Sequence, residues 1–263
     1  MDTNSEPAEA PLLISKVDGV VILTLNRPRQ FNALSVALLN ALHAALDRIL
    51  TDDAARVLVI AANGNAFCAG HDLKEMRAAN EQASVAKLFK LCSEMMLKIA
   101  RLPLPVIAEV NGMATAAGCQ LVAQCDLAVA SDEATFAVSG VNLGLFCATP
   151  AVPLSRAISR KRAAEMLMTG EFIDAATALD WGLVNRAVPR DALRAETLKL
   201  AASLKAKPRA TLALGKALFY RQMEVGIANA YEDASNTIAC NFMQPEAQEG
   251  VAAFLEKRKP VWE

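Results

Sequence analysis

The chain has 263 residues, of which 54% are apolar, and its formal net charge is -1. This length and apolar content suffice for one large domain, while the balanced charge and the lack of a Lys/Arg stripe argue against nucleic-acid binding. No uncharged apolar run reaches the roughly 18 residues of a membrane span, because Gln120, Gln124 and Asp126 interrupt the longest candidate, 112–130.

The first eleven residues, MDTNSEPAEAP, are acidic and rich in small side chains, so we expect a disordered tail over 1–11. They lack the hydrophobic stretch of a secretory signal and the Arg-rich composition of a transit peptide. We therefore expect a cytoplasmic protein. The six cysteines form no CxxC pair, and only two histidines are present. This predicts reduced, mostly buried thiols and no metal site.

The N-terminal part of the chain predicts a hairpin followed by a helix. Two apolar runs, 12–17 and 20–25, flank an Asp-Gly pair, which is a strong hairpin signal. Ser35 is a suitable N-cap for a helix over 36–49, in which apolar residues recur every three or four positions. The run 56–62 has the pattern of a buried strand.

Further along, the alternation of short strands and helices indicates an α/β core over 12–200. We expect a strand at 106–110, a helix of small residues at 114–125 and a strand at 127–130. After about residue 150 the strand signals stop, which predicts a C-terminal helical region over 201–263. The helices expected after residue 150 include 162–169, 174–181 and 209–221.

Two segments join a strand to a helix through small residues. The first is FCAGHDLKEM, 67–76, in which Asp72 and Glu75 match a capping box. The second is VNGMATAAGCQ, 110–120. Free N–H groups at a helix start attract a developing negative charge, so two such junctions would form an oxyanion hole if they converge. Taken alone, each junction is better explained as a close-packed turn.

Six segments, in order along the chain, carry a family resemblance. They are LTLNRPRQFNALS (23–35), NAFCAGHDLKEM (65–76), PVIAEVNGMATAAGCQLVAQCDLAVAS (105–131), TFAVSGVNLGLF (135–146), AAEMLMTGEFIDAATALDWGLVNRAVP (163–189) and EGVAAFLEKRKPVW (249–262). Together they resemble the crotonase (enoyl-CoA hydratase/isomerase) superfamily. The resemblance implies an α/β fold, with a ββα-repeat core and a C-terminal helical trimerisation region. It also implies an acyl-CoA thioester as ligand, no separate cofactor, and a homotrimer or a dimer of trimers.

The resemblance also assigns site residues by motif position. It implies that the backbone N–H groups of His71 and Ala117 polarise the thioester carbonyl. Lys259 matches a basic residue that can reach the CoA nucleotide, sometimes that of a neighbouring subunit. The other positions that match CoA-contacting residues of the family are Arg29, Ala33, Leu34, Ala69, His71, Asp72 and Leu73.

Gln120 and Gly140 depart from the family pattern. The resemblance implies that a hydratase carries a glutamate at each position, and that the two carboxylates hold the attacking water and move protons. A glutamine amide can hydrogen-bond a water but cannot act as a general base near neutral pH, and Gly140 has no side chain. Each such group contributes ~10²–10⁴-fold, so we expect ordinary hydration to be weak or absent.

Three hypotheses follow for the function. The preferred one is an enzyme of fatty acid metabolism that acts on acyl- or enoyl-CoA with unconventional acid–base chemistry. The alternatives are a non-catalytic acyl-CoA-binding or regulatory paralogue, and a scaffold that retains only the oligomer. The small residues of both junctions argue against the scaffold. The strings ATAAGCQL, SGVNLGLFC and GHDLKE closely resemble an animal subgroup that also lacks the glutamate pair, which leaves the first two hypotheses open.

Other polar residues could replace the missing acid. The His71 ring is the first candidate, although we expect it to face solvent. Cys147 and Thr149 follow a strand near the site, and we expect them to fill the pocket wall. Glu109 lies in a strand pattern, where pairing with a neighbour or an outward position is expected. For Asp126, between a helix and a strand, a structural hydrogen-bonding role is expected.

Overall fold

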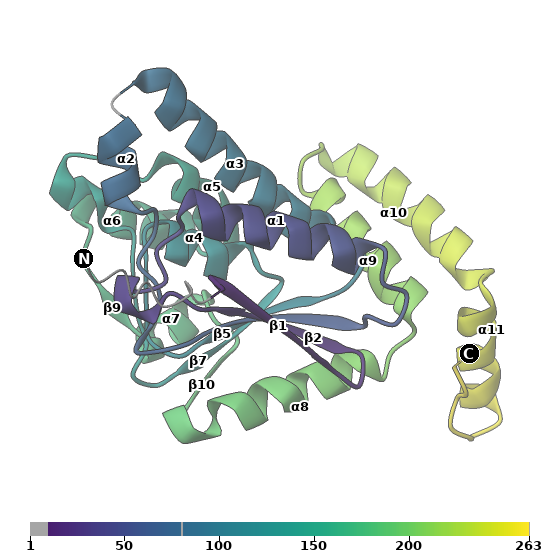
Figure 1. Ribbon diagram of the computed structural model, residues 1–263. Coiled ribbons are helices and arrows are strands. Elements are labelled where there is room, and N and C mark those ends of the chain that lie inside the picture. The colour runs from purple at the N-terminus through teal and green to yellow at the C-terminus, as the bar shows by residue number, and fades with distance from the viewer. Residues whose placement is uncertain (1–9, 80, 263) are drawn as a thin grey trace.

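A six-stranded sheet forms the centre of the molecule in the computed structural model, which describes residues 10–79 and 81–262. The strand order is β1-β2-β3-β5-β7-β10, and every neighbouring pair after the β1–β2 hairpin is parallel (Figure 1). The strands are β1 Leu12–Val17, β2 Val20–Leu25, β3 Val57–Ala62, β5 Val106–Val110, β7 Leu127–Ser131 and β10 Arg186–Val188.

A second sheet lies at the end of these strands, in the order β4-β6-β8-β9. Along the chain, β3 is followed by β4, β5 by β6, and β7 by β8. Each of these short strands then leads into a helical segment. This succession is the expected ββα repeat. The strands are β4 Ala66–Cys68, β6 Met113–Thr115, β8 Thr135–Ala137 and β9 Ile173–Asp174.

Helices cover both faces of the large sheet, with α1 and α3 on one face and α8 on the other (Figure 1). One apolar cluster packs on the α1 side and contains Leu23, Leu25 and Leu39, while a smaller one on the α8 side contains Ile22 and Leu200. The helices are α1 Val36–Leu50, α2 Leu73–Ala79, α3 Gln82–Arg101, α4 Ala117–Gln124, α5 Ala148–Ala157, α6 Arg160–Thr169, α7 Ala175–Trp181, α8 Leu193–Lys205, α9 Arg209–Gln222, α10 Ile227–Phe242 and α11 Pro245–Leu255.

The predicted hairpin and first helix are confirmed. Strands β1 and β2 pair from Leu12 with Leu25 to Val17 with Val20. Helix α1 begins where expected, because the Ser35 hydroxyl accepts a hydrogen bond from the Leu38 N–H at 3.2 Å.

Two expectations were wrong in detail. The helix expected at 114–125 begins only at Ala117, because Met113–Thr115 pairs as β6 and Ala116 takes a positive φ of 51°. Strands also continue beyond residue 150, as β9 and β10. They have two and three residues, which is too short for a period-2 apolar pattern to register.

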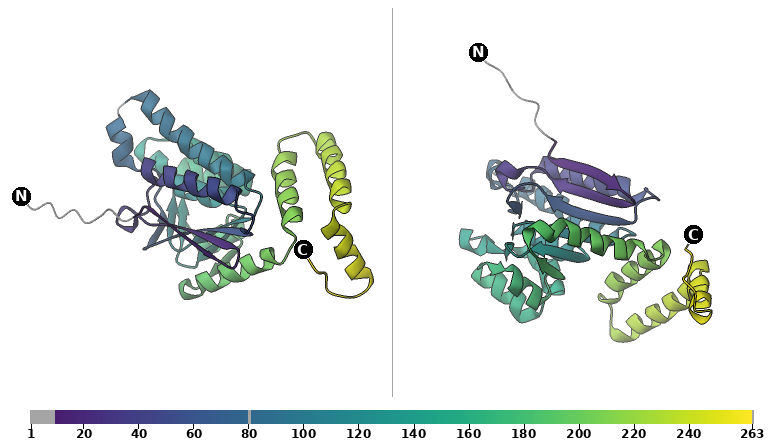
Figure 2. Two further views of the ribbon diagram at one scale, coloured as in Figure 1. Left: turned by 45° about the vertical axis from the view of Figure 1, so that its right-hand side comes forward. Right: turned by 90° about the horizontal axis from the view of Figure 1, so that it is seen from below.

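Helices α9–α11, which we call the C-terminal arm, project away from the core (Figure 2). Every residue of α9 and α10 is at least partly exposed. The Lys216 side chain, which is 8% exposed, joins α9 to the core by donating to the carbonyl oxygens of Ile99 at 2.9 Å and Leu104 at 3.0 Å, and to Asp126 Oδ2 at 2.7 Å. Tyr220 also donates to Asp126, at 2.8 Å. At the start of α9, Arg209 also pairs with Asp53 of the core at 3.0 Å. Polar contacts at both ends of α9 therefore attach the arm.

Of the predicted tail, residues 1–9 lie outside the described residues. At its end, the Ala10 and Pro11 carbonyls accept hydrogen bonds from Asn26, at 3.0 and 2.9 Å.

Helix α8 crosses the boundary placed at residue 200 and packs on the sheet, so the arm separates after it. Over the described ranges, no helix combines the length and apolar composition needed to cross a bilayer.

Candidate functional site

The two small-residue junctions meet at Gly70. Its φ is +93°, and a Cβ placed on it would lie 2.9 Å from the Ala116 Cβ and 3.2 Å from the Ala117 nitrogen. Only a glycine fits such a close approach of two backbones. The segment that carries His71 and the start of α4 therefore lie side by side.

The first turn of α4 is held in place from two more directions. A Cβ on Gly118 would lie 2.0 Å from the Cys68 carbonyl oxygen, so this turn packs directly on the end of β4. The Ala116 N–H donates to the Ala137 carbonyl of β8 at 3.0 Å. The start of α4 is thus fixed between two strands of the small sheet.

The backbone N–H groups of His71 and Ala117 are available to a ligand. Within residues 10–79 and 81–262, neither of them donates a hydrogen bond to a protein acceptor. Ala117 is buried and opens α4, where the helix dipole adds positive potential. Two unpaired N–H groups on adjoining segments can stabilise a negative charge on one oxygen atom.

The His71 ring packs against α3 instead of facing solvent, so the expectation for it was wrong. It contacts Phe89 edge-on, with ring centroids 4.9 Å apart. Its Nε2 is enclosed and has no hydrogen-bond partner in the described part of the chain. Burial lowers the pKa of His71 to about 4, which leaves the imidazole neutral near pH 7.

Gln120 brings an unsatisfied amide to the same helix turn. The residue is only 3% exposed, and its Oε1 has no hydrogen-bond partner among the described residues. Side chains on a helix lean toward its N-terminus. The amide therefore lies over the first turn of α4, where Ala117 is placed.

Gly140 lies in a tightly closed loop. A Cβ on it would be 2.5 Å from the Leu145 carbonyl oxygen and 2.8 Å from the Cys147 sulfur. Its N–H donates to the Cys147 Sγ at 3.3 Å. The preceding Ser139 hydroxyl is 2.9 Å from that of Thr115, which connects this loop to the second junction. The loop leaves no space for a side chain at position 140.

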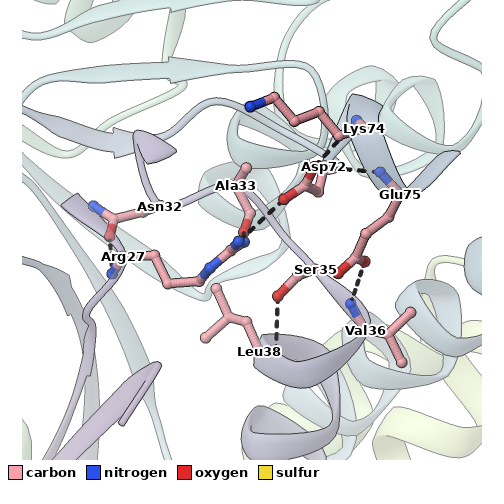
Figure 3. A network of polar contacts seen from close by, with 9 residues as sticks. All are labelled: Arg27, Asn32, Ala33, Ser35, Val36, Leu38, Asp72, Lys74 and Glu75. Carbon is pink, nitrogen blue, oxygen red and sulfur yellow. Dashed lines mark hydrogen bonds and ion pairs between the residues drawn. The ribbon is translucent and has the colours of Figure 1, made fainter. Parts of the chain in front are cut away.

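The first junction is fixed to the loop before α1 by a polar network (Figure 3). Arg27 pairs with Asp72 at 3.1 Å and donates to the Ala33 carbonyl at 2.6 Å. Asp72 caps α2 through the N–H groups of Lys74 and Glu75, at 3.1 and 3.4 Å. Burial opposes ionisation of Asp72, but the Arg27 and backbone hydrogen bonds outweigh it and lower its pKa.

Glu75 does not complete the expected capping box. Its carboxylate instead accepts from the Val36 N–H at 2.8 Å, which ties α2 to the start of α1 (Figure 3). The Asp72 N–H donates to the Leu34 carbonyl at 3.3 Å. The polar side chains of this junction thus hold its backbone in place.

Most residues expected to contact CoA are brought together. Leu34 pairs with His71 as an isolated parallel bridge, and its N–H donates to the Gly70 carbonyl at 2.7 Å. The Ala69 N–H donates to the Phe31 carbonyl at 3.0 Å. Ala33 is joined to Asp72 through the shared Arg27. Arg29, in the short helix 28–30, and Leu73, at the start of α2, are exposed.

Lys259 is separated from this group within one chain. It follows α11 on the projecting arm (Figure 2) and is exposed. Beside it, Arg258 holds the chain end against α11 through Glu249 at 2.6 Å.

Two other candidates lie away from the junctions. Glu109 faces α8 and pairs with Arg194 at 2.9 Å, as expected, and its burial raises its pKa. Asp126 accepts hydrogen bonds from Val106, Lys216 and Tyr220, which confirms a structural role.

Sequence reasoning missed the residues that hold the site together. Asn32 is fully buried and donates to the Asn63 and Ala66 carbonyls at 2.9 and 2.8 Å, while its Oδ1 accepts from the Arg27 N–H at 2.8 Å. The sequence signal available was two polar residues, Arg27 and Asn32, close before a capped helix. Besides their bond to each other, they have partners more than thirty positions away, which no local pattern reveals.

A sequence model described as enoyl-CoA hydratase/isomerase matches residues 15–263. The chain belongs to this family. An enoyl-CoA hydratase structure from Mycobacterium smegmatis is 58% identical, with a TM-score of 0.94, over 98% of this chain and 99% of that one. The human enoyl-CoA hydratase domain-containing protein 3 structure is 45% identical, with a TM-score of 0.92, over 96% and 100% of the two chains.

Relatives also confirm the subgroup that the three sequence strings indicated. The mouse protein of the same name is 47% identical over 93% of this chain and 82% of its own length. Its name includes the word mitochondrial, as do those of the rat, frog and human relatives. The cytoplasmic expectation was therefore wrong. The expectation depended only on residues 1–11, in which we found neither a secretory signal nor a transit peptide. The absence of these signals does not indicate any particular compartment.

Proposed function

We propose that the chain binds acyl-CoA thioesters, with the thioester carbonyl accepting hydrogen bonds from the His71 and Ala117 N–H groups. The close approach of Gly70 to Ala116 carries this proposal, because it brings both N–H groups to one place. Two family relatives have names that specify CoA thioesters. They are the 2,3-dehydroadipyl-CoA hydratase of Escherichia coli, 32% identical, and the mevalonyl-coenzyme A hydratase of Aspergillus fumigatus, 33% identical.

The polarised carbonyl acidifies the carbon next to it, so the site suits reactions that develop an enolate. Ordinary hydration also needs groups that deliver water and move protons. Gln120 cannot act as a base, and Gly140 has no side chain. We therefore propose an enzyme of the enoyl-CoA hydratase/isomerase type in which hydration itself is weak or absent.

A second candidate function is a non-catalytic acyl-CoA-binding or regulatory paralogue. The packing around Gly140 favours it, because the Leu145 carbonyl and the Cys147 sulfur fill the space that a side chain would need. The neutral His71 ring, turned onto Phe89, offers no charged acid in compensation. The two candidates share the binding site and differ only in turnover.

The arm supports a homotrimer or a dimer of trimers as the assembly. It exposes large apolar side chains, which in a monomer would remain in water. They include Phe219, Ile227, Tyr231, Ile238 and Phe254, which are between 56% and 82% exposed. In such an assembly, Lys259 of one copy could reach the CoA nucleotide bound to another. Analytical ultracentrifugation tests this, and a monomer at micromolar concentration would contradict it.

Calorimetry with acetyl-, crotonyl- and octanoyl-CoA tests binding directly. We expect a Kd in the micromolar range, about -8 kcal/mol. Free CoA is the control for the thioester contribution, because it lacks the carbonyl. Mass spectrometry of the same mixtures reports turnover and separates the two candidates. No binding of any thioester at near-millimolar protein would reject both.

A further inference from the structure

The peptide unit that carries the His71 N–H is held at its other end. An amide is planar and trans, so its N–H and its C=O point in opposite directions. The carbonyl of this unit belongs to Gly70, and it accepts a hydrogen bond from the Leu34 N–H at 2.7 Å. Because the two groups share one rigid plane, this bond also fixes the direction in which the His71 N–H points.

The Leu34 N–H belongs to a second peptide unit, whose carbonyl is that of Ala33. This carbonyl accepts a hydrogen bond from the Arg27 guanidinium at 2.6 Å (Figure 3). Arg27 therefore begins a series of hydrogen bonds that passes through two peptide units and ends at the His71 N–H. Within the part of the chain that the structure describes, that last N–H has no protein acceptor.

The bonds of this series all run in one direction. A carbonyl that accepts a hydrogen bond makes its own amide N–H a stronger donor, because hydrogen bonds in series polarise one another. The first donor is a cation, and hydrogen bonds from charged groups are about twice as strong as those between neutral groups. The Arg27 side chain is only 20% exposed, so salt screens its charge less than at an open surface. The series thus increases the positive character of the His71 N–H.

Asp72 holds the guanidinium in place. Its carboxylate accepts from the second terminal nitrogen of Arg27 at 3.1 Å. Its backbone N–H donates to the Leu34 carbonyl at 3.3 Å. The two backbone bonds of Leu34 therefore lie on either side of His71, and its N–H points away from them.

The Ala117 N–H is supported in another way. The carbonyl of its peptide unit is that of Ala116, which accepts from the uncharged Gln120 N–H at 3.0 Å. Its positive potential comes from the start of α4. A change at Arg27 therefore alters one donor of the candidate site and leaves the other as it is.

We propose that Arg27 is a positioning residue, whose guanidinium orients and polarises the His71 N–H through these two peptide units. The inference rests on the proposed thioester binding and adds how one of its two donors is prepared. Free CoA has no thioester carbonyl and gains nothing from this donor. The effect of Arg27 is therefore expected in the difference in affinity between a thioester and free CoA.

NMR of the full chain tests the series without any ligand. Glycine labelled with ¹³C at its carbonyl and histidine labelled with ¹⁵N mark a single peptide bond, because Gly70-His71 is the only Gly-His pair in the sequence. Arg27→Gln removes the charge. We expect the labelled carbon and nitrogen to shift upfield in this variant, as both do when the hydrogen bond to the carbonyl weakens. Arg27→Met repeats the test if the glutamine variant does not fold.

Calorimetry with butyryl-CoA and free CoA measures the effect on a ligand. For Arg27→Gln we expect the ratio of the two Kd values to move toward one by about three- to tenfold, the worth of one ordinary hydrogen bond. Arg27→Lys keeps the charge and should stay within about twofold of the native ratio. Arg56→Gln is the matched control, because Arg56 also donates to backbone carbonyls, those of Lys205 at 3.1 Å and Lys207 at 2.7 Å. It should leave both the labelled signals and the ratio unchanged.

Labelled signals that stay in place in the neutral Arg27 variants would overturn the inference. An equal change of the ratio in Arg27→Gln and Arg56→Gln would also overturn it, because the loss would then reflect general destabilisation. A lysine variant that loses the ratio as fully as the glutamine variant would mean that the charge has no role, which is contrary to the inference. If the native chain binds no thioester, the proposed function fails, while the NMR result still decides whether Arg27 polarises the His71 N–H.

Discussion

Gly70 and Ala116 approach so closely that a Cβ on Gly70 would lie 2.9 Å from that of Ala116. These residues belong to different junctions and are far apart in the sequence. Their contact brings the His71 backbone to the start of α4, where Ala117 begins the helix. The candidate site depends on this one contact more than on any side chain.

Gly70→Ala is expected to destabilise the fold and weaken thioester binding. The new methyl group would meet Ala116, and φ is +93°. Gly182→Ala is the matched control, because Gly182 has a φ of +84° but no atom within 4 Å of its added Cβ. We expect Gly70→Ala to cost about 1–3 kcal/mol more than the control in denaturant unfolding. Equal costs for the two variants would show that the close contact has no energetic role.

Restoring both carboxylates is not expected to restore hydration. Gln120→Glu alone should raise crotonyl-CoA hydration by less than about tenfold, because the two groups act on one water. Adding Gly140→Glu should destabilise the loop instead of completing the site, since its Cβ would lie 2.5 Å from the Leu145 carbonyl. The hydration rate is measured from the loss of absorbance of the enoyl thioester. Gly226→Glu is the control, because Gly226 has a negative φ of -65° and its added Cβ meets nothing within 4 Å. A gain of about 10²-fold in a folded double variant would contradict the prediction.

Lys216→Met should loosen the arm. The variant leaves Asp126 without its cation, and the two side chains are only 8% and 16% exposed. Removing one partner of a buried pair costs about 3–5 kcal/mol. Limited proteolysis should then cut between α8 and α9. Lys90→Met removes an exposed pair with Glu94, 3.8 Å apart, and should change stability by less than about 1 kcal/mol. An arm that resists protease in Lys216→Met would mean that α9 is held by other contacts.

Acid should destabilise the chain partly through His71. Burial lowers its pKa from 6.5 to about 4. Between these two pH values the imidazole is therefore mostly protonated in the unfolded chain and mostly neutral in the folded chain. Stability from this residue is complete above pH 6.5 and is lost as pH falls toward 4. An NMR titration of the ring protons, with His43→Gln for assignment, measures the pKa. A midpoint near 6.5 would mean that the ring is solvated.

Local patterns in the sequence determined the elements that are long and regular. The Asp-Gly hairpin and the Ser35-capped helix follow from turn chemistry and from helical periodicity, which act within a few residues. The resemblance of six ordered segments determined the ββα core and the family. Strands β9 and β10 were not predicted, because they are defined by pairing with distant strands and not by their own composition.

Only the tertiary structure decided how the site is filled. The identity of Gly140 was visible in the sequence, but the blocked space around it depends on Leu145 and Cys147, where the loop closes on itself. The expectation that the His71 ring faces solvent failed because Phe89 arrives from α3, a separate element. Asn32 and Arg27 bind partners far along the chain. Periodicity and capping are local properties, whereas packing and hydrogen-bond partners are set by segments that meet only after the chain has folded.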